Sequence, residues 1–215
     1  MKKIEINTSF KKFLADVYTP VGIYLRLRDR FRDTILLEST DFHVAENSYS
    51  FIGINAIAGI EITNPKEIEF KLPGKEPEKI KIDKAKNITD HLWEFMQRFE
   101  MKEAAKKPIN IAQGLFGYTT YDAVQFFDTI KFSESKVSPT GEGLGGPEIP
   151  LMRYRLYQYV IAINHFKDEL FICENHINTI SSEGDVVERL IKSKDVPSYP
   201  FCIKGFGSMG LSFPN

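Results

Sequence analysis

Hydrophobic and polar positions alternate in short runs along much of the chain, which is the pattern of β-strands that bury one face. The clearest example flanks Pro73-Gly74, where apolar and charged residues alternate on both sides of a turn-forming dipeptide. Two longer apolar runs turn at residues 165–168 and predict a second hairpin. The pattern as a whole predicts strands over residues 34–38, 49–55, 56–63, 67–72, 79–83, 151–164 and 169–175, the second and third of which can join as one long bent strand.

Helical spacing marks fewer segments of the chain. Thr19-Pro20 predicts a helix start, with Thr as the N-cap and Pro at the first helical position, and the helix is expected to reach about Phe31. Apolar residues at positions 92, 95, 96 and 99 follow the i, i+3, i+4, i+7 pattern of an amphipathic helix that Asn87 or Thr89 can cap. Further helices are predicted over residues 121–127 and around residues 186–191.

The order of these elements predicts the fold class. Strands outnumber helices, they follow one another in hairpins, and no strand–helix–strand rhythm is present in the sequence. This order indicates an α+β fold with a largely antiparallel sheet. Residues 1–200 are expected to form one domain, whereas residues 201–215 hold three glycines without periodicity or a cap signal and are expected to form a disordered tail.

Composition narrows the class of protein. The 215 residues carry a net charge of −1, which argues against a nucleic-acid surface as the main role of the chain. Seventeen Phe and nine Tyr imply a sizeable packed core. No apolar stretch reaches the about 18 residues that a membrane span needs, and the N-terminus lacks the apolar run of a signal peptide. Because Cys173 and Cys202 have no metal-ligand spacing and nothing suggests an oxidising compartment, we expect a cytoplasmic protein.

No catalytic constellation stands out in the sequence. The glycine-rich residues 141–146 are followed by Pro147 and a predicted strand, so they lack the strand–loop–helix context of a phosphate loop. The four histidines are scattered without metal-ligand spacing, and neither cysteine has the context of a nucleophile. We therefore expect no catalytic residue, no metal site and no cofactor in this chain.

The stretch Leu36-Leu37-Glu38-Ser39 brings a carboxylate and a hydroxyl together where a predicted strand ends. Thr40-Asp41 are turn formers, and a strand that ends there allows both side chains to face one pocket. An acid next to a hydroxyl can hold both polar ends of a free amino acid, although the tetrapeptide taken alone fits an ordinary strand terminus better. The aromatic residues 113–122, punctuated by glycine, fit core packing between a strand and a helix better than ligand contact.

Several blocks of the sequence, taken in order and spacing, carry a family resemblance. They are Thr19-Pro20-Val21, Leu25-Arg26-Leu27-Arg28, Leu36-Leu37-Glu38-Ser39, Ser48-Tyr49-Ser50-Phe51-Ile52-Gly53, and Gly114-Leu115-Phe116-Gly117-Tyr118 with Tyr121-Asp122. Over roughly residues 10–195 the chain resembles the N-terminal domain of anthranilate synthase component I. The close relative aminodeoxychorismate synthase component I shares most of these blocks, and their conjunction is more specific than any one of them.

This resemblance implies an α+β sandwich with flanking helices that packs onto a larger chorismate-binding half. The whole enzyme of that family converts chorismate to anthranilate with magnesium, using ammonia from a glutamine amidotransferase partner. The catalytic and magnesium residues belong to the other half, so the resemblance implies that this chain alone is inactive. It also implies a tryptophan feedback site at Glu38, Ser39, Tyr49 and Ser50, where Glu38 can pair with the ligand ammonium and Ser39 can hydrogen-bond the ligand or hold the pocket edge.

Two departures from the family pattern leave alternatives open. Ser48 stands where family members commonly have Arg, and residues 205–215 do not continue into the catalytic half. A truncated product or a frame change near the end would explain the second departure. The alternatives are a fragment of aminodeoxychorismate synthase component I, which serves folate synthesis, a stand-alone amino-acid-binding module, and a non-functional gene remnant. Because loss of a covering half exposes apolar surface, we also expect self-association.

Overall fold

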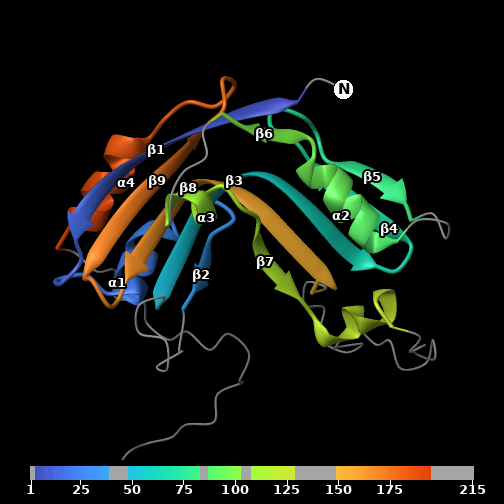
Figure 1. The fold of residues 1–215 in the computed structure, drawn as a ribbon, viewed down its shortest axis with the longest axis horizontal. Coiled ribbons are helices and arrows are strands. Elements are labelled where there is room, and N and C mark those ends of the chain that lie inside the picture. The colour runs from blue at the N-terminus through green and yellow to red at the C-terminus, as the bar shows by residue number, and fades with distance from the viewer. Residues whose placement is uncertain (1–2, 39–47, 83–86, 103–107, 129–148, 195–215) are drawn as a thin grey trace, which may run out of the picture.

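One strongly curved sheet dominates the protein (Figure 1). The computed structural model describes residues 3–38, 48–82, 87–102, 108–128 and 149–194. The strands are β1 (Ile4–Leu14), β2 (Ile35–Leu37), β3 (Tyr49–Asn64), β4 (Glu67–Lys71), β5 (Glu78–Lys81), β6 (Phe99–Met101), β7 (Phe116–Thr119), β8 (Met152–Asn164) and β9 (Glu169–His176). The main path of the sheet is β5-β4-β3-β8-β9-β1-β6, with β2 paired to β3 and β7 paired to β8.

The α+β class predicted from the sequence is confirmed, and the sheet is mixed rather than purely antiparallel. Residues 4–6 of β1 pair in parallel with residues 99–101 of β6, whereas the other described strand pairs are antiparallel. The expected sandwich takes the form of one curved sheet with helices packed on it, because all the described strands are connected by pairing. The sequence pattern did not predict β1 and β6.

The two apolar runs predicted over residues 49–55 and 56–63 form one long bent strand, β3. The register between β3 and β8 shifts between Ala56 and Ala58, which marks a β-bulge. Asn55, just before the shift, has a φ of 57°, a left-handed conformation that Asn adopts more readily than most residues. Its side-chain amide donates a hydrogen bond of 2.6 Å to Gln158 Oε1, and this bond ties the bend of β3 to β8.

Both predicted hairpins are confirmed. β4 pairs with β5 on either side of a turn in which Gly74 has a φ of 67°, a conformation that favours glycine. β8 pairs with β9, and the connecting turn includes Asp168 at a φ of 50°. The turn residues predicted from the sequence therefore lie in the turns that connect the paired strands. The expected tail, residues 201–215, and the glycine-rich residues 141–146 lie outside the described residues.

The first two helices begin where their capping signals predict. α1 (Pro20–Leu27) follows Thr19, whose Oγ1 accepts a hydrogen bond of 3.1 Å from the Gly22 amide, and it ends before the expected Phe31. α2 (Ile88–Met96) follows Asn87, and Phe99 lies in β6 rather than in the helix. The remaining helices are α3 (Ile109–Ala112), the 3-10 helix η2 (Tyr121–Phe126) and α4 (Gly184–Lys192).

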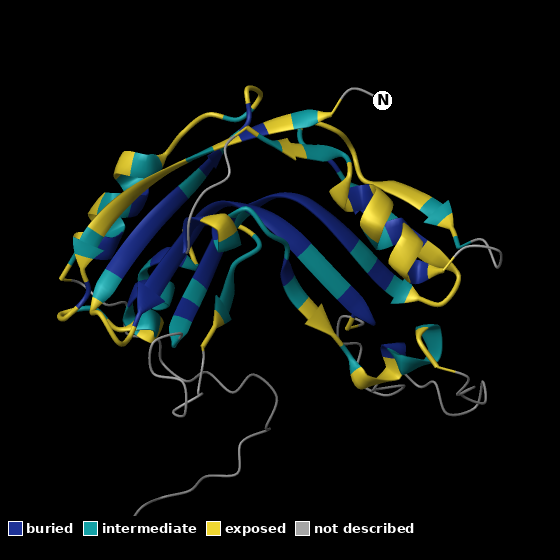
Figure 2. Cartoon of the chain, viewed as in Figure 1, coloured by how far each residue is buried: buried dark blue, intermediate teal, exposed yellow. Residues whose placement is uncertain are grey.

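The core is centred on β3 and β8, which are buried along most of their length (Figure 2). At one end of the sheet, α1 and α4 contribute Ile23 and Val187 to a cluster with the isoleucines of these two strands. At the other end, Phe95 of α2 stacks on Phe70 of β4 with ring centroids 5.8 Å apart. A third cluster includes Phe116 of β7. The central pair of strands is thus held from several sides, and it forms the rigid support for the sites described below.

Candidate functional site

The described residues that are predicted to bind tryptophan lie on or directly after two neighbouring strands. β2 pairs antiparallel with β3, with Leu37 opposite Phe51. Glu38 follows Leu37 directly and is exposed, whereas Ser39 lies outside the described residues. On β3, Tyr49 is half-buried and Ser50 is buried. Pairing of the two strands therefore brings Glu38 to the end of β3 that carries Tyr49 and Ser50.

Tyr49 and Ser50 are held in place by the turn between β8 and β9. Ser50 Oγ lies 2.7 Å from His165 Nε2, and the Tyr49 hydroxyl accepts a hydrogen bond of 2.8 Å from Asn164 Nδ2. The His165 amide also donates to the carbonyl oxygen of Ser48 over 3.0 Å. Ser50 is only 1% exposed, so its contact with His165 is a buried one that holds this end of β3 against the β8–β9 turn. Sequence reasoning assigned His165 to a surface turn and did not find its bond to Ser50.

A pocket of about 310 Å³ lies between β2, β7 and β8. Glu38, Tyr49 and Ser50 do not line this pocket. It is therefore separate from the described part of the predicted tryptophan site. Its walls include Asp33 next to β2, Phe116 and Tyr118 of β7, and Arg153, Arg155 and Tyr157 of β8.

Charged side chains of both signs meet at this pocket. Arg153 donates to Asp33 over 2.8 Å, and its Nε lies 3.5 Å from the Glu61 carboxylate. Arg155 pairs with the same Glu61 carboxylate. Lys71 Nζ lies 3.6 Å from Asp33. Sequence reasoning missed this cluster, because the residues come from separate strands and no spacing along the chain connects them.

The aromatic segment around β7 shows the core packing favoured from the sequence and also forms part of a pocket wall. Phe116 is 6% exposed and packs edge-to-face on Tyr157 with centroids 6.3 Å apart, which is core packing. Tyr118 is exposed and lines the pocket. A Cβ atom at Gly117 would lie 1.8 Å from the carbonyl oxygen of Arg153, so only glycine allows β7 to approach β8 this closely.

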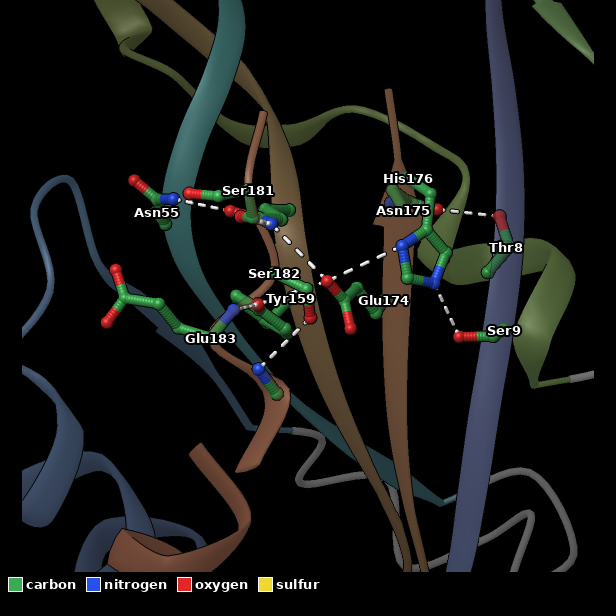
Figure 3. A network of polar contacts seen from close by, with 12 residues as sticks. Thr8, Ser9, Asn55, Tyr159, Glu174, Asn175, His176, Ser181, Ser182 and Glu183 are labelled. Atoms are coloured by element: carbon green, nitrogen blue, oxygen red, sulfur yellow. Dashed lines mark hydrogen bonds and ion pairs between the residues drawn. The ribbon is translucent and has the colours of Figure 1, made fainter. Parts of the chain in front are cut away.

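A second polar cluster anchors the start of α4 to β8 and β9 (Figure 3). The Tyr159 hydroxyl donates to Glu174 Oε1 over 3.1 Å and accepts a hydrogen bond from the Glu183 amide. Gln158 Nε2 donates to the Ser181 carbonyl oxygen over 2.8 Å. Burial raises the pKa of the Tyr159 hydroxyl, so it stays protonated as a donor. These groups provide hydrogen-bond partners for one another, and the cluster has the structural role of holding α4 on the sheet.

Two classes of feature are absent from the part of the chain that the structure describes. In these residues no three His, Cys, Asp or Glu side chains gather closely enough to hold a metal ion. Within the same ranges no helix combines the length and the apolar character that crossing a membrane requires.

Three known proteins are similar to this chain in sequence. Anthranilate synthase component 1 of Acinetobacter calcoaceticus is 26% identical over 194 residues, which is 85% of this chain and 36% of that protein. The protein of the same name from Lactococcus lactis is 22% identical over 84% of this chain and 35% of its own length. That of Pseudomonas aeruginosa is 30% identical over 65% of this chain and 26% of its own length. No family model matches the chain.

The crystal structure of anthranilate synthase component I from Streptococcus pneumoniae covers 84% of this chain, with 18% identity and a TM-score of 0.42, and the chain covers 35% of it. The chain thus spans about a third of the length of the first two relatives named above. The relatives confirm the resemblance carried by the sequence blocks: over most of its length, this chain is similar to anthranilate synthase component 1.

Proposed function

We propose that this chain is the tryptophan-binding and structural part of an anthranilate synthase component 1 and that it does not convert chorismate by itself. The observation that carries the proposal is sequence similarity to proteins of that name over 84–85% of the chain. Conversion of chorismate to anthranilate belongs, in this proposal, to a further region that corresponds to the rest of the relatives' length. That region also supplies the magnesium site and the contact with a glutamine amidotransferase.

The pairing of β2 with β3 supports a ligand site at this end of the sheet. Glu38 is exposed beside the strand that carries Tyr49 and Ser50, so its carboxylate is accessible to the ammonium group of an amino acid. The rings of Tyr49 and Phe51 stack at 5.9 Å and offer an aromatic surface next to that carboxylate. Hydrogen bonds to the β8–β9 turn hold Tyr49 and Ser50 in place before any ligand arrives, which lowers the entropy cost of binding.

Glu38 and Ser39 have separate roles in the proposed site. The Glu38 carboxylate pairs with the tryptophan ammonium, a charge-assisted hydrogen bond that contributes about 1.5–3 kcal/mol. The Ser39 hydroxyl bonds the ligand or holds the edge of the pocket. The other wall of the pocket belongs to the region outside this chain, so the isolated chain carries only half of the site.

Calorimetric titration of the chain with tryptophan tests the half-site directly. We expect no measurable heat or only weak binding, because one wall of the pocket is missing. Micromolar affinity, a binding free energy of about −8 kcal/mol, would instead favour a stand-alone amino-acid-binding module.

A chimaera tests the regulatory role. The aligned segment of the Acinetobacter calcoaceticus protein is replaced by this chain, and chorismate-dependent product formation is measured against tryptophan concentration. We expect anthranilate as the product and inhibition by tryptophan. Ser39→Phe should abolish that inhibition while turnover is largely retained, because in this proposal residue 39 serves ligand binding and takes no part in catalysis.

Ser9→Phe is the matched control, since Ser9 is exposed on β1 and β1 is separated from β3 by two strands. This variant should keep both turnover and inhibition. Inhibition that survives Ser39→Phe would contradict the proposed site. Formation of aminodeoxychorismate by a full-length protein that joins this chain to its own catalytic region would assign the chain to the folate-pathway relative.

A further inference from the structure

We propose that the pocket between β2, β7 and β8 binds a small molecule with one ring and a carboxylate, at a site separate from Glu38, Tyr49 and Ser50. β2 and β7 flank the central strands on the inner side of the curved sheet (Figure 1). Arg153, Arg155 and Tyr157 occupy alternate positions on β8 and line the pocket together. The inference does not depend on the proposed tryptophan site, since no described residue of that site lines the pocket.

The charge balance around the pocket favours an anion. Arg153, Arg155 and Lys71 carry three positive charges, and only Asp33 and Glu61 oppose them. Each cation has a carboxylate partner, and the cluster as a whole carries a net charge of +1. Each guanidinium offers five N–H donors in a planar fork that matches a carboxylate, so a ligand carboxylate would complete the balance.

Arg155 supplies a donor that the protein leaves unused. Its side chain is only 9% exposed, and its Nε–H is buried without a hydrogen-bond partner. The two terminal nitrogens are occupied, one by the Ile60 carbonyl oxygen at 3.3 Å and the other by Glu61. A buried donor without an acceptor is unfavourable, and an oxygen atom of a bound anion would relieve that cost.

The other walls of the pocket fit an aromatic ring. Phe116 and Tyr157 present an edge-to-face pair, and Tyr118 stands at the opening with 38% of its surface exposed. A volume of about 310 Å³ is at the lower end of small-molecule sites, which span about 300–1,000 Å³. This size suits a single-ring carboxylate.

Ligand-observed saturation-transfer NMR on the full chain tests the proposal, with benzoate as the probe and benzamide as the neutral control. We expect saturation transfer to benzoate and binding of benzamide that is weaker by about tenfold, since the amide lacks the charge that the arginines recognise. Arg153→Gln should weaken benzoate binding by about tenfold. Asp33 keeps Lys71 as a partner in this variant, which limits the damage to the fold.

Two further variants make the result decisive. Arg189→Gln removes an exposed arginine on α4 that does not line the pocket, and it should leave benzoate binding unchanged. Tyr118→Ala removes an exposed ring at the pocket opening and should weaken binding even if Arg153→Gln does not fold. The proposal is overturned by absence of transfer at about 10 mM benzoate, by equal binding of benzamide, or by equal losses in Arg153→Gln and Arg189→Gln.

Discussion

Tyr157 is a buried residue whose ionisation should make the fold sensitive to alkaline pH. Burial raises the pKa of its hydroxyl to about 12, and burial likewise raises the pKa of the Cys173 thiol to about 12. An unfolded tyrosine has a pKa of about 10. Below that pH the hydroxyl is protonated in both the folded and the unfolded protein, so its contribution to the free energy of unfolding is fully present. Between about pH 10 and pH 12 the unfolded state loses its proton first, so stability decreases as pH rises.

We expect Tyr157→Phe to reduce this alkaline loss. Each such group contributes a slope of about 1.4 kcal/mol per pH unit to the free energy of unfolding in that window. Urea unfolding at a series of pH values from about 8 to about 11 measures the slope. Tyr121→Phe is the matched control, because Tyr121 is 82% exposed, and it should keep the slope of the unsubstituted protein. An unchanged slope in Tyr157→Phe would contradict the assignment.

Single residues of the sites were predictable only in part. The family resemblance implies Glu38, Ser39, Tyr49 and Ser50 as ligand contacts, which stays a prediction, and β2–β3 pairing brings Glu38 to the end of β3 that carries Tyr49 and Ser50. The partner of Ser50, His165, lies 115 residues further along the chain, and no local pattern connects them. Arg155 was not predicted for a similar reason, because a buried arginine is defined by its neighbours in space and not by its neighbours in sequence.

Among the elements, β3 depends on one residue at its bend. Asn55 combines a φ of 57° with a hydrogen bond to Gln158. We expect Asn55→Ala to lower the free energy of unfolding by about 2–3 kcal/mol, from the lost bond together with the left-handed conformation. Asn55→Gly should cost about 1 kcal/mol less than Asn55→Ala, because glycine adopts that φ without strain. Equal thermal denaturation midpoints for the two variants would show that the left-handed conformation at residue 55 does not contribute to the loss of stability.

Local signals predicted the elements that depend on local sequence. The turns of both hairpins and the cap at Thr19 were predicted correctly, since turn and cap chemistry acts over a few residues. β1 was missed because only Ile6 of its eleven residues is buried, so its hydrophobic alternation is weak. The amphipathic helix α2 was predicted to extend too far. Phe99 continues the helical spacing of apolar residues, but it belongs to β6 and pairs with β1.

At the scale of the whole molecule, the chain corresponds to about a third of its first two relatives, and large apolar side chains are exposed on it. These include Trp93 at 61%, Phe127 at 53% and Ile149 at 60%. We expect the isolated chain to self-associate, because water contact with such side chains is unfavourable. Light scattering during size-exclusion chromatography over a range of concentrations measures the mass. A monomer mass at every concentration would contradict this expectation.

The position of β1 in the sheet has a consequence for how the chain folds. β1 pairs with β9 along eight residues, and the Thr8 hydroxyl donates to Asn175 across 167 positions of sequence. Contacts between such distant segments form slowly, because the long intervening loop must close before pairing returns any free energy. During synthesis β1 leaves the ribosome before the other described strands, yet residues 7–14 of it cannot pair until β9 has been made. The first strand of the chain is therefore among the last to take its place in the sheet.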